Sequence, residues 1–244
     1  MTQRPGVLIT RAAAEAKAMA DAVQGMGAKV LFEPVLTIEP LDDASLDLSG
    51  VQAIAFTSAN GVRAFVRSSA VRELEVFAVG EVTAAACRAA NFAAVRNADG
   101  DALELALLIQ QALDPRAGAI LHPSGADVAG DLAGDLAAAG FIYRRAIVYR
   151  AVAALSLSAA TARAFRSGAI AVAVFFSPRG AAIFARLALE QGLQPALSSV
   201  VAVCLSAAVR SSVAHLEWAE IVIADEPTPG ALLGCLKNAI AAIP

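Results

Sequence analysis

An internal repeat is the feature of this sequence that most limits the folds it can adopt. Short apolar runs alternate with alanine-rich segments of helical period along the 244 residues, a pattern typical of βα units wound into a parallel sheet. The series runs to about residue 113 and begins again near residue 119. Because both series have the same order, the chain is predicted to contain two copies of one α/β fold that face each other across a cleft.

Glycine and proline mark the ends of several predicted elements. Gly27 and Gly140 are expected to end equivalent helices, and Pro34 interrupts the second strand. The first series has predicted strands at 7–9, 29–38, 52–56, 76–79 and 93–96, with helices at 13–26 and 102–113. The second series has predicted strands at 119–121, 143–151, 171–176, 201–203 and 220–224, with helices at 128–139 and 231–240.

The composition argues against several classes of partner. A net charge of −3 leaves no basic surface of the kind that nucleic acid or anionic lipid requires. The mean hydropathy of +0.63 is high. The longest uncharged stretch, 191–209, nevertheless contains Gln, Pro and several Ser, so it is not expected to span a membrane. No signal peptide precedes the first strand, and we expect a cytoplasmic protein.

The cysteines do not predict a metal site or a disulfide framework. Cys87, Cys204 and Cys235 lie far apart without a CxxC pair, and the chain has only two histidines. We expect three buried thiols.

The carboxyl ends of the predicted strands are where a ligand is expected. Helix N-termini present their amides at this edge of an open parallel sheet. The edge holds mostly hydroxyl and small residues, with Arg11, Arg63 and Arg179 nearby, which favours carboxylates or phosphates as ligands. Helix N-capping, worth about 1 kcal/mol each, explains any single Ser, Thr or Asn equally well. The positions are Thr10–Arg11, 57–60, 80–83, 122–125, 177–180 and Ser206.

Familiar catalytic motifs are missing from the sequence. No GxGxxG follows the first strand, and there is no P-loop, HExxH or GxSxG elbow, which argues against nucleotide cofactors and hydrolase triads. Asp127, Asp131 and Asp135 recur every four residues, and a solvated helix face explains them better than a row of metal ligands.

Two aromatic residues, one at this edge and one on a connecting strand, have more than one interpretation. His122 is expected to be a structural hydrogen-bonding residue, with substrate contact as the alternative. Tyr149 lies in a long connecting strand. It is either an amphipathic residue of that connection or a hydroxyl that protonates a leaving group.

Several short motifs together resemble the uroporphyrinogen-III synthase family over nearly the whole chain. Their order and spacing, rather than any single motif, carry the resemblance. Two places depart from the pattern: residues 204–207 read CLSA where many relatives have Gly followed by Thr, and His122-Pro123 is not typical. The motifs are Val7–Arg11, Phe32–Pro34, Phe56–Val62, Ala78–Ala84, Val148–Arg150 and Phe176–Pro178.

The resemblance implies a cofactor-free lyase that closes linear hydroxymethylbilane to uroporphyrinogen III. Water is lost, and the last pyrrole ring is inverted through a spiro intermediate. Tyr149 is then expected to act as general acid, with Thr83 as a second donor. The substrate carries eight carboxylates, which suits an edge of helix N-termini, hydroxyls and arginines. The residues expected to bind it are Arg11, Ser58, Asn60, Gly61, Gly80, Ser124, Gly125, Ser177, Arg179 and Ser206.

The boundary between the lobes differs from the boundary between the two copies. Residues 1–37 resemble the start of one lobe that continues at 151–244, and residues 38–150 form the inserted lobe. The predicted fold class is α/β, with two similar doubly wound parallel-sheet lobes joined by crossover strands near 30–40 and 143–152. We expect a monomer that binds a small-molecule substrate, without metal, cofactor, nucleic acid or membrane. A non-catalytic two-lobe binding module and an inactive synthase relative are the alternatives.

Overall fold

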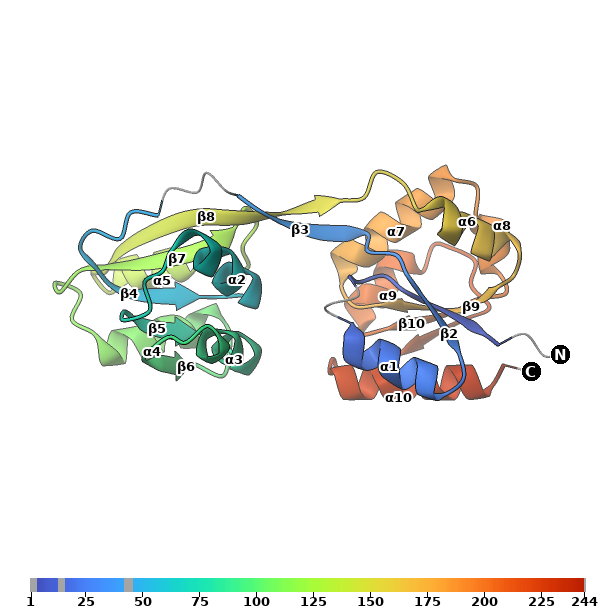
Figure 1. Ribbon diagram of the computed structural model, residues 1–244, viewed down its shortest axis with the longest axis horizontal. Helices are drawn as coiled ribbons and strands as arrows, with labels where there is room; N and C mark the ends of the chain where they lie inside the picture. The colour runs from blue at the N-terminus through green and yellow to red at the C-terminus, as the bar shows by residue number, and fades with distance from the viewer. Residues whose placement is uncertain (1–3, 13–15, 42–45, 244) are drawn as a thin grey trace. The chain divides into compact units, whose positions relative to one another are not determined.

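The chain divides into two compact units (Figure 1). A computed structural model describes residues 4–12, 16–41 and 46–243. Unit 1 comprises Met1–Thr37 and Ala153–Pro244, and unit 2 comprises Ile38–Val152. Each unit contains its own sheet.

Unit 1 is built on a five-stranded sheet in the order β11-β10-β9-β1-β2, and the strand pairs are parallel. The strand β1 from the N-terminal segment therefore lies beside β9 from the C-terminal half (Figure 1). Its strands are β1 (Gly6–Ile9), β2 (Lys29–Phe32), β9 (Ile170–Phe175), β10 (Val201–Cys204) and β11 (Glu220–Ile223). Its helices are α1 (Lys17–Gly25), α6 (Ala159–Arg166), α7 (Pro178–Glu190), α8 (Gln194–Leu197), α9 (Ala207–Val213) and α10 (Pro229–Ala241).

Unit 2 is built on a six-stranded sheet in the order β3-β8-β7-β4-β5-β6. The pairs among β8, β7, β4, β5 and β6 are parallel. Its strands are β3 (Leu36–Pro40), β4 (Val51–Phe56), β5 (Glu75–Ala78), β6 (Val95–Asn97), β7 (Ala119–Gly125) and β8 (Ile142–Ala153). Its helices are α2 (Ala59–Ser68), α3 (Glu81–Ala89), α4 (Ala102–Ala112) and α5 (Leu132–Ala138).

The internal repeat is visible in the order of the strands. The order β2-β1-β9-β10-β11 in unit 1 corresponds to β8-β7-β4-β5-β6 in unit 2. Both sheets also have a register shift at the same point, because Ala171 in β9 and Gln52 in β4 are the residues passed over in pairing with β1 and β7. This shared irregularity aligns the copies residue by residue, with Val7 equivalent to Ile120.

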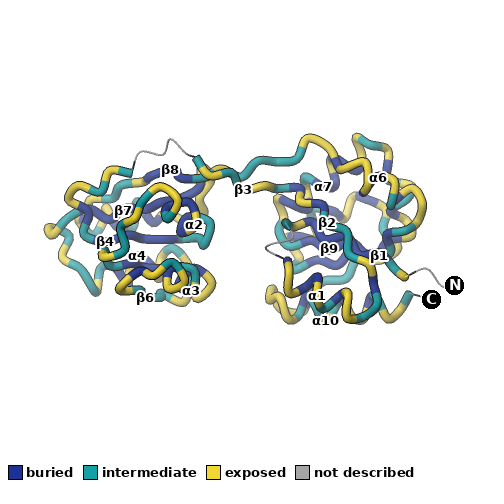
Figure 2. The backbone as a smooth tube through the Cα atoms, viewed as in Figure 1, coloured by how far each residue is buried: buried dark blue, intermediate teal, exposed yellow. Residues whose placement is uncertain are grey.

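Each sheet is covered by helices on both faces. Val7 and Ile9 point to a core with α1 and α10, whereas Leu8 points to a core with α6, α7 and α9. In unit 2, Ile54 and Phe56 pack with α2 and α3, and the alternate residues of β4 pack with α4 and α5. Strands β4, β7 and β9 are accordingly almost entirely buried (Figure 2). Burial on both faces is typical of doubly wound parallel sheets.

The predicted strand at 29–38 is two strands. Glu33 and Pro34 separate β2 from β3, because proline lacks the amide that strand pairing needs. Strand β3 lies beside β8. The amide of Leu41 donates to the Val148 carbonyl and that of Ala154 to the Val35 carbonyl. The partners therefore run in opposite directions, so this edge pair is antiparallel.

Two predicted elements around the start of the second series have different bounds. The strand predicted at 119–121 continues through Gly125, and the helix predicted at 128–139 begins only at Leu132. Gly130 has a positive φ of 75° and Asp131 is the N-cap, so the preceding residues cannot continue the helix. Helix α1 begins at Lys17, and residues 13–15 of its predicted range lie outside the described residues.

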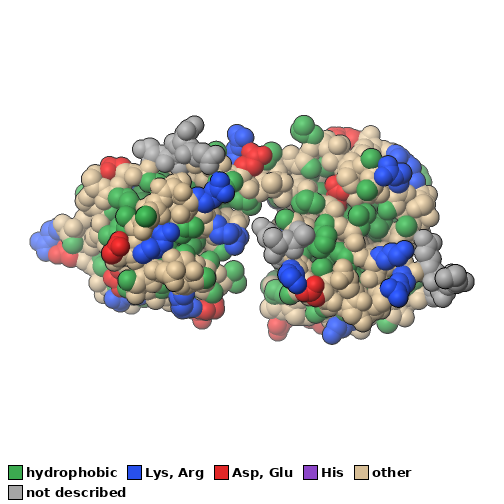
Figure 3. Space-filling model, in the orientation of Figure 1, with side chains coloured by type: hydrophobic (Ala, Val, Ile, Leu, Met, Phe, Trp, Pro, Cys, Tyr) green, Lys and Arg blue, Asp and Glu red, His purple; other side chains and the backbone are tan. Residues whose placement is uncertain are grey.

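Charged side chains of both signs are mixed on one face of the molecule (Figure 3). On the face shown in Figure 3, acidic and basic side chains are scattered among uncharged atoms. Within the described ranges, every helix is too short or too polar to cross a membrane.

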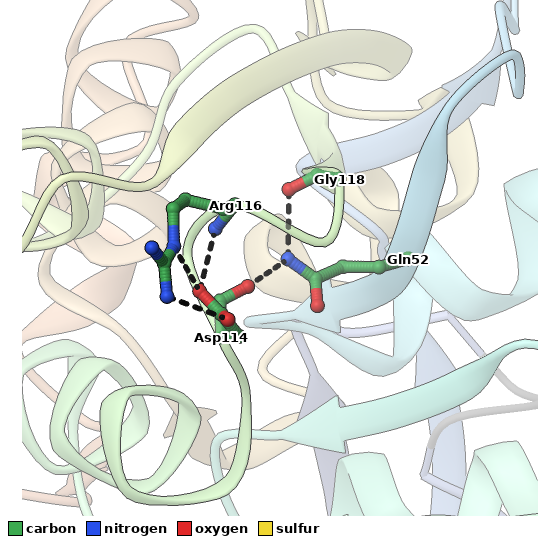
Figure 4. A network of polar contacts seen from close by, with 4 residues as sticks. All are labelled: Gln52, Asp114, Arg116 and Gly118. Atoms are coloured by element: carbon green, nitrogen blue, oxygen red, sulfur yellow. Dashed lines mark hydrogen bonds and ion pairs between the residues drawn. The ribbon is translucent and has the colours of Figure 1, made fainter.

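A polar network fixes the amino-terminal end of the sheet in unit 2 (Figure 4). The Gln52 side-chain amide donates to the carbonyls of Asp114, at 3.0 Å, and Gly118, at 2.7 Å. The amide of Arg116 donates to the Asp114 carboxylate at 2.9 Å, which closes the turn before β7. The backbone at Gly118 lies close to Gly50. A Cβ on Gly118 would lie 2.6 Å from the Gly50 carbonyl oxygen, so only glycine fits there without a shift of the backbone.

The Gly118→Ala variant is expected to lose about 1–3 kcal/mol of unfolding free energy, because the backbone must move to admit the methyl group. The matched control is Gly234→Ala, since Gly234 is exposed in α10 and a Cβ there meets nothing within 4 Å. That control should gain up to about 1 kcal/mol from helix propensity. Urea unfolding measures both variants, and equal midpoints for Gly118→Ala and wild type would contradict the close contact.

Candidate active site

A hollow of about 600 Å³ lies at the carboxyl ends of the strands in unit 2. Ser58 and Tyr149, two of the predicted site residues, line it together with Thr57, which the sequence placed at the ligand edge without assigning it to binding or catalysis. Thr57 follows β4 directly, so its place after a central strand was the signal that pointed to it. The lining comprises Thr57, Ser58, Val79, Gly100, Asp101, Ala102, Leu103, Asp127, Val128, Ala129, Gly130, Asp131, Asp135 and Tyr149.

Helix starts place several of these groups. The Ser58 hydroxyl accepts the Asn60 amide at 3.1 Å at the start of α2. Asp101 begins α4 with a capping box, and Asp131 caps α5 by accepting the Gly134 amide at 3.0 Å. Parallel strands bring these starts to the same edge of the sheet, so backbone amides and capping side chains gather around the hollow.

The charged residues of the lining are all aspartates. Asp101, Asp127, Asp131 and Asp135 contribute to it. The prediction that Asp127, Asp131 and Asp135 share one helix face is wrong, because Asp127 precedes α5, Asp131 caps it and only Asp135 lies within it. The hollow therefore disfavours an anion and favours a neutral or cationic group.

The ring of Tyr149 packs against Gly125. These residues are paired between β7 and β8, and a Cβ at Gly125 would lie 2.7 Å from the ring carbons Cε2 and Cζ. Only glycine at this position leaves room for the ring where it stands. Gly125 therefore sets the position of the Tyr149 hydroxyl.

The sequence placed Ser124 and Gly125 in a loop beyond the strand. In the structure both residues lie inside β7. Ser124 is only 2% exposed. Its hydroxyl accepts from the Arg145 guanidinium at 2.9 Å, and the same guanidinium reaches the carbonyls of Gly125 and Ala126, both at 2.6 Å. Ser124 thus anchors the end of β7 in this structure.

A buried histidine connects two hydroxyl groups. His122 is 2% exposed, and its Nε2 lies 2.8 Å from the Thr57 Oγ1 while its Nδ1 lies 2.7 Å from the Tyr143 hydroxyl. Burial, reinforced by the positive charge of Arg145, lowers the pKa of His122 to about 4. The imidazole is therefore neutral at pH 7, and the bonding on both sides agrees with the structural role expected from the sequence.

Comparison with known proteins identifies the family. The model of the family "Uroporphyrinogen-III synthase HemD" matches residues 17–234. The chain belongs to the uroporphyrinogen-III synthase family. This confirms the resemblance seen in the sequence motifs and assigns the chain to haem biosynthesis.

Solved synthase structures share the fold. The enzyme from Helicobacter pylori aligns with a TM-score of 0.64 at 16% identity over 98% of this chain and 100% of that chain. A mutant synthase from the extremely thermophilic bacterium Thermus thermophilus aligns with a TM-score of 0.54 at 16% identity over 98% and 100% of the two chains. At this identity the likeness shows the fold alone, and it confirms the predicted α/β class. A search of curated protein sequences finds no match.

In unit 1 of this synthase-family chain, the predicted residues lie at the carboxyl ends of β1, β9 and β10. Ser177 accepts the Gly180 amide at 3.2 Å, and Ser206 accepts the Val209 amide at 3.4 Å. Both serines therefore cap helices, as Ser58 does. The Arg11 guanidinium lies 4.7 Å from the centre of the Phe176 ring. Arg179 is exposed in the first turn of α7.

The other predicted residues of unit 2 do not line the hollow. The Asn60 amide oxygen accepts from Arg63 at 2.6 Å. Gly61 lies so close to β7 that a Cβ would be 2.5 Å from the Pro123 carbonyl. Gly80 is the N-cap of α3. Thr83, expected as a second donor, is only 5% exposed in the first turn of that helix, a position that does not suit a catalytic hydroxyl.

The cysteines of this synthase-family chain follow the expectation in part. Cys87 and Cys204 are buried, and burial raises the pKa of each thiol to about 12. Cys235 is only partly buried. Among the residues that the structure describes, no group of three or more His, Cys, Asp or Glu side chains is placed to hold a metal ion.

The low pKa of His122 predicts acid sensitivity. The unfolded chain takes up a proton on this residue below about pH 6.5, whereas the folded protein holds the ring neutral until about pH 4. The unfolding free energy should therefore fall by up to ~3 kcal/mol from this group as the pH drops from 6.5 to 4. The groups bonded to the ring or acting on it by charge are Thr57, Tyr143 and Arg145.

Urea unfolding at several pH values measures this dependence in wild type, His122→Ile and the control His215→Asn. His215 is the other histidine of the chain and is exposed. The fall in unfolding free energy between pH 6.5 and pH 4 should be smaller in His122→Ile than in wild type, and it should persist in His215→Asn. An unchanged fall in His122→Ile would exclude His122 as its source.

Proposed function

We propose that this chain is an active uroporphyrinogen-III synthase, a hydro-lyase that converts hydroxymethylbilane into uroporphyrinogen III and water. The observation that carries the proposal is the hollow in unit 2, which Tyr149, Ser58 and Thr57 line together with aspartates. Membership of the synthase family supplies the reaction.

The reaction begins with loss of the hydroxyl group from the terminal hydroxymethylpyrrole. The C–O bond breaks, the oxygen takes a proton and departs as water, and the pyrrole nitrogen stabilises the resulting azafulvenium cation. We assign the proton to Tyr149 as general acid. The substituted carbon of the last ring attacks the cation and gives the spiro intermediate. Reopening and closure invert that ring, and its final rearomatisation releases a proton that restores the tyrosine.

The charges of the hollow suit this first step. A neutral hydroxymethyl group enters an acidic hollow without repulsion, and carboxylates stabilise the cation that forms there. Carboxylates of the substrate require other partners. We assign them to Arg11, Ser177, Arg179 and Ser206 in unit 1 and to Asn60, Gly61 and Gly80 in unit 2. Ser124 and Gly125 support the site through Arg145 and Tyr149.

The reaction needs no cofactor, because hydroxide leaves a hydroxymethylpyrrole readily and positioning selects the ring carbon that attacks. We propose that the protein acts as a monomer in the cytoplasm.

The product isomer tests the proposed activity. Purified protein is incubated with hydroxymethylbilane, and the oxidised porphyrin isomers are separated. Isomer III is expected, whereas isomer I alone, as in the enzyme-free control, would refute the activity and favour an inactive relative or a binding module.

Two variants test the general acid. Tyr149→Phe should lower kcat by about 100-fold, the lower end of the range for acid–base catalysis. Gly125→Ala should also lower kcat, because its methyl group displaces the ring of Tyr149. Arg116→Gln, at the opposite end of the sheet (Figure 4), serves as the control that keeps wild-type rates. Full activity in Tyr149→Phe would remove the acid assignment.

A further inference from the structure

We propose that Thr57 contacts the departing hydroxyl group of the substrate and that His122 is the positioning residue that holds Thr57 for this contact. This inference rests on the proposed synthase activity. It adds a second hydroxyl to the site beside Tyr149, and it gives the buried histidine a role in the reaction.

The geometry connects the hollow to the interior of the sheet. Thr57 lines the hollow, and its Oγ1 lies 2.8 Å from the Nε2 of His122. The other ring nitrogen lies 2.7 Å from the Tyr143 hydroxyl. The three side chains come from the end of β4, from β7 and from β8, so three adjacent strands hold them in place.

The neutral imidazole decides where the proton of Thr57 points. One ring nitrogen of a neutral histidine donates and the other accepts. A phenol is more acidic than an aliphatic alcohol and is the better donor, so Tyr143 donates to Nδ1 and the N–H at Nε2 donates to Thr57. The lone pair of Thr57 that faces His122 is then occupied, and its proton is available to an acceptor in the hollow.

The internal repeat shows that the fold does not need this polar chain. By strand register, Ile9 in unit 1 is equivalent to His122, Val30 to Tyr143, and Phe176 to Thr57. All three equivalents are apolar and pack in one hydrophobic core. Unit 2 therefore has three hydrogen-bonding side chains at positions where the same fold elsewhere in the chain has hydrocarbon.

The proposed step gives a second hydrogen-bond donor a role beside Tyr149. The departing oxygen gains negative charge as the C–O bond breaks and can accept more than one hydrogen bond. In the proposed step Tyr149 transfers its proton to the departing oxygen, whereas Thr57 donates a hydrogen bond to that oxygen and keeps its proton.

The first experiment compares the variants Thr57→Val and Thr57→Ser with the wild-type protein, after the wild-type protein has been shown to form isomer III. Thr57→Val should lower kcat by 10-fold or more with little change in KM, because the contact strengthens as the bond breaks. Thr57→Ser keeps the hydroxyl and should stay within about threefold of wild type. A kcat of Thr57→Val equal to that of wild type would overturn the proposal, and so would equal losses in both variants.

The second experiment tests the role of His122. His122→Ile introduces the residue found at the equivalent position in unit 1 and should also lower kcat by 10-fold or more. Because His122 acts through Thr57 in this proposal, the double variant His122→Ile with Thr57→Val should be no slower than the slower of the two single variants. Tyr143→Phe should give a smaller loss, because only the tautomer preference is removed. Multiplied losses in the double variant would show that His122 does not act through Thr57.

Folding and activity are separated by urea unfolding of each variant. If His122→Ile does not fold, the Thr57→Val and Thr57→Ser pair still decides the proposal, since Thr57 is only partly buried. Wild-type protein that yields isomer I alone would refute the synthase activity and this inference together. Isomer III from wild type with full activity in Thr57→Val would refute the inference only.

Discussion

A parallel strand cannot return to its neighbour through a tight turn, and this constraint arranges every site in the molecule. Each parallel strand needs a crossover, usually a helix, before the next one, so the carboxyl ends of the strands and the starts of the following helices gather at one edge. In unit 2 this edge carries Ser58, Asp101 and Asp131 as helix caps. The hollow arises there because the loops after four strands end around it. The position of the candidate site thus follows from the sheet before any side chain is considered.

The two copies of the fold show what the sheet requires and what the site adds. Both have the same strand order and the same register shift, at Ala171 and at Gln52. Each copy also needs a glycine near the start of this strand, Gly6 at the first residue of β1 and Gly118 one residue before β7, since a Cβ at either would strike a neighbouring carbonyl. These features belong to the fold. His122 does not, because its equivalent is Ile9, and burying an imidazole costs free energy that an apolar residue avoids.

Most central strands and several helix caps could be predicted from the sequence because these depend on local signals. Buried runs such as 52–56 and caps such as Ser177 need no knowledge of distant residues. The length of β7 depends on its neighbours. Pro123 and Ser124 are typical of a turn, yet β7 pairs with β4 only as far as Leu121 and continues along β8. A proline is tolerated where one side of the strand has no partner. The pairing of Thr57 with His122 spans 65 residues, which no local pattern reveals.

The charge of the hollow constrains how a substrate with eight carboxylates fits this chain. Four aspartates in the lining would repel those carboxylates, so the polar periphery of the substrate must lie away from the hollow. The terminal hydroxymethyl carbon is the part that begins neutral and becomes cationic, and it is the part that an acidic hollow with neutral hydroxyl donors favours. In the proposed mechanism negative charge acts on the reacting carbon, while helix N-termini and arginines hold the carboxylates. This division accounts for aspartates in the candidate site although the proposed substrate is itself acidic.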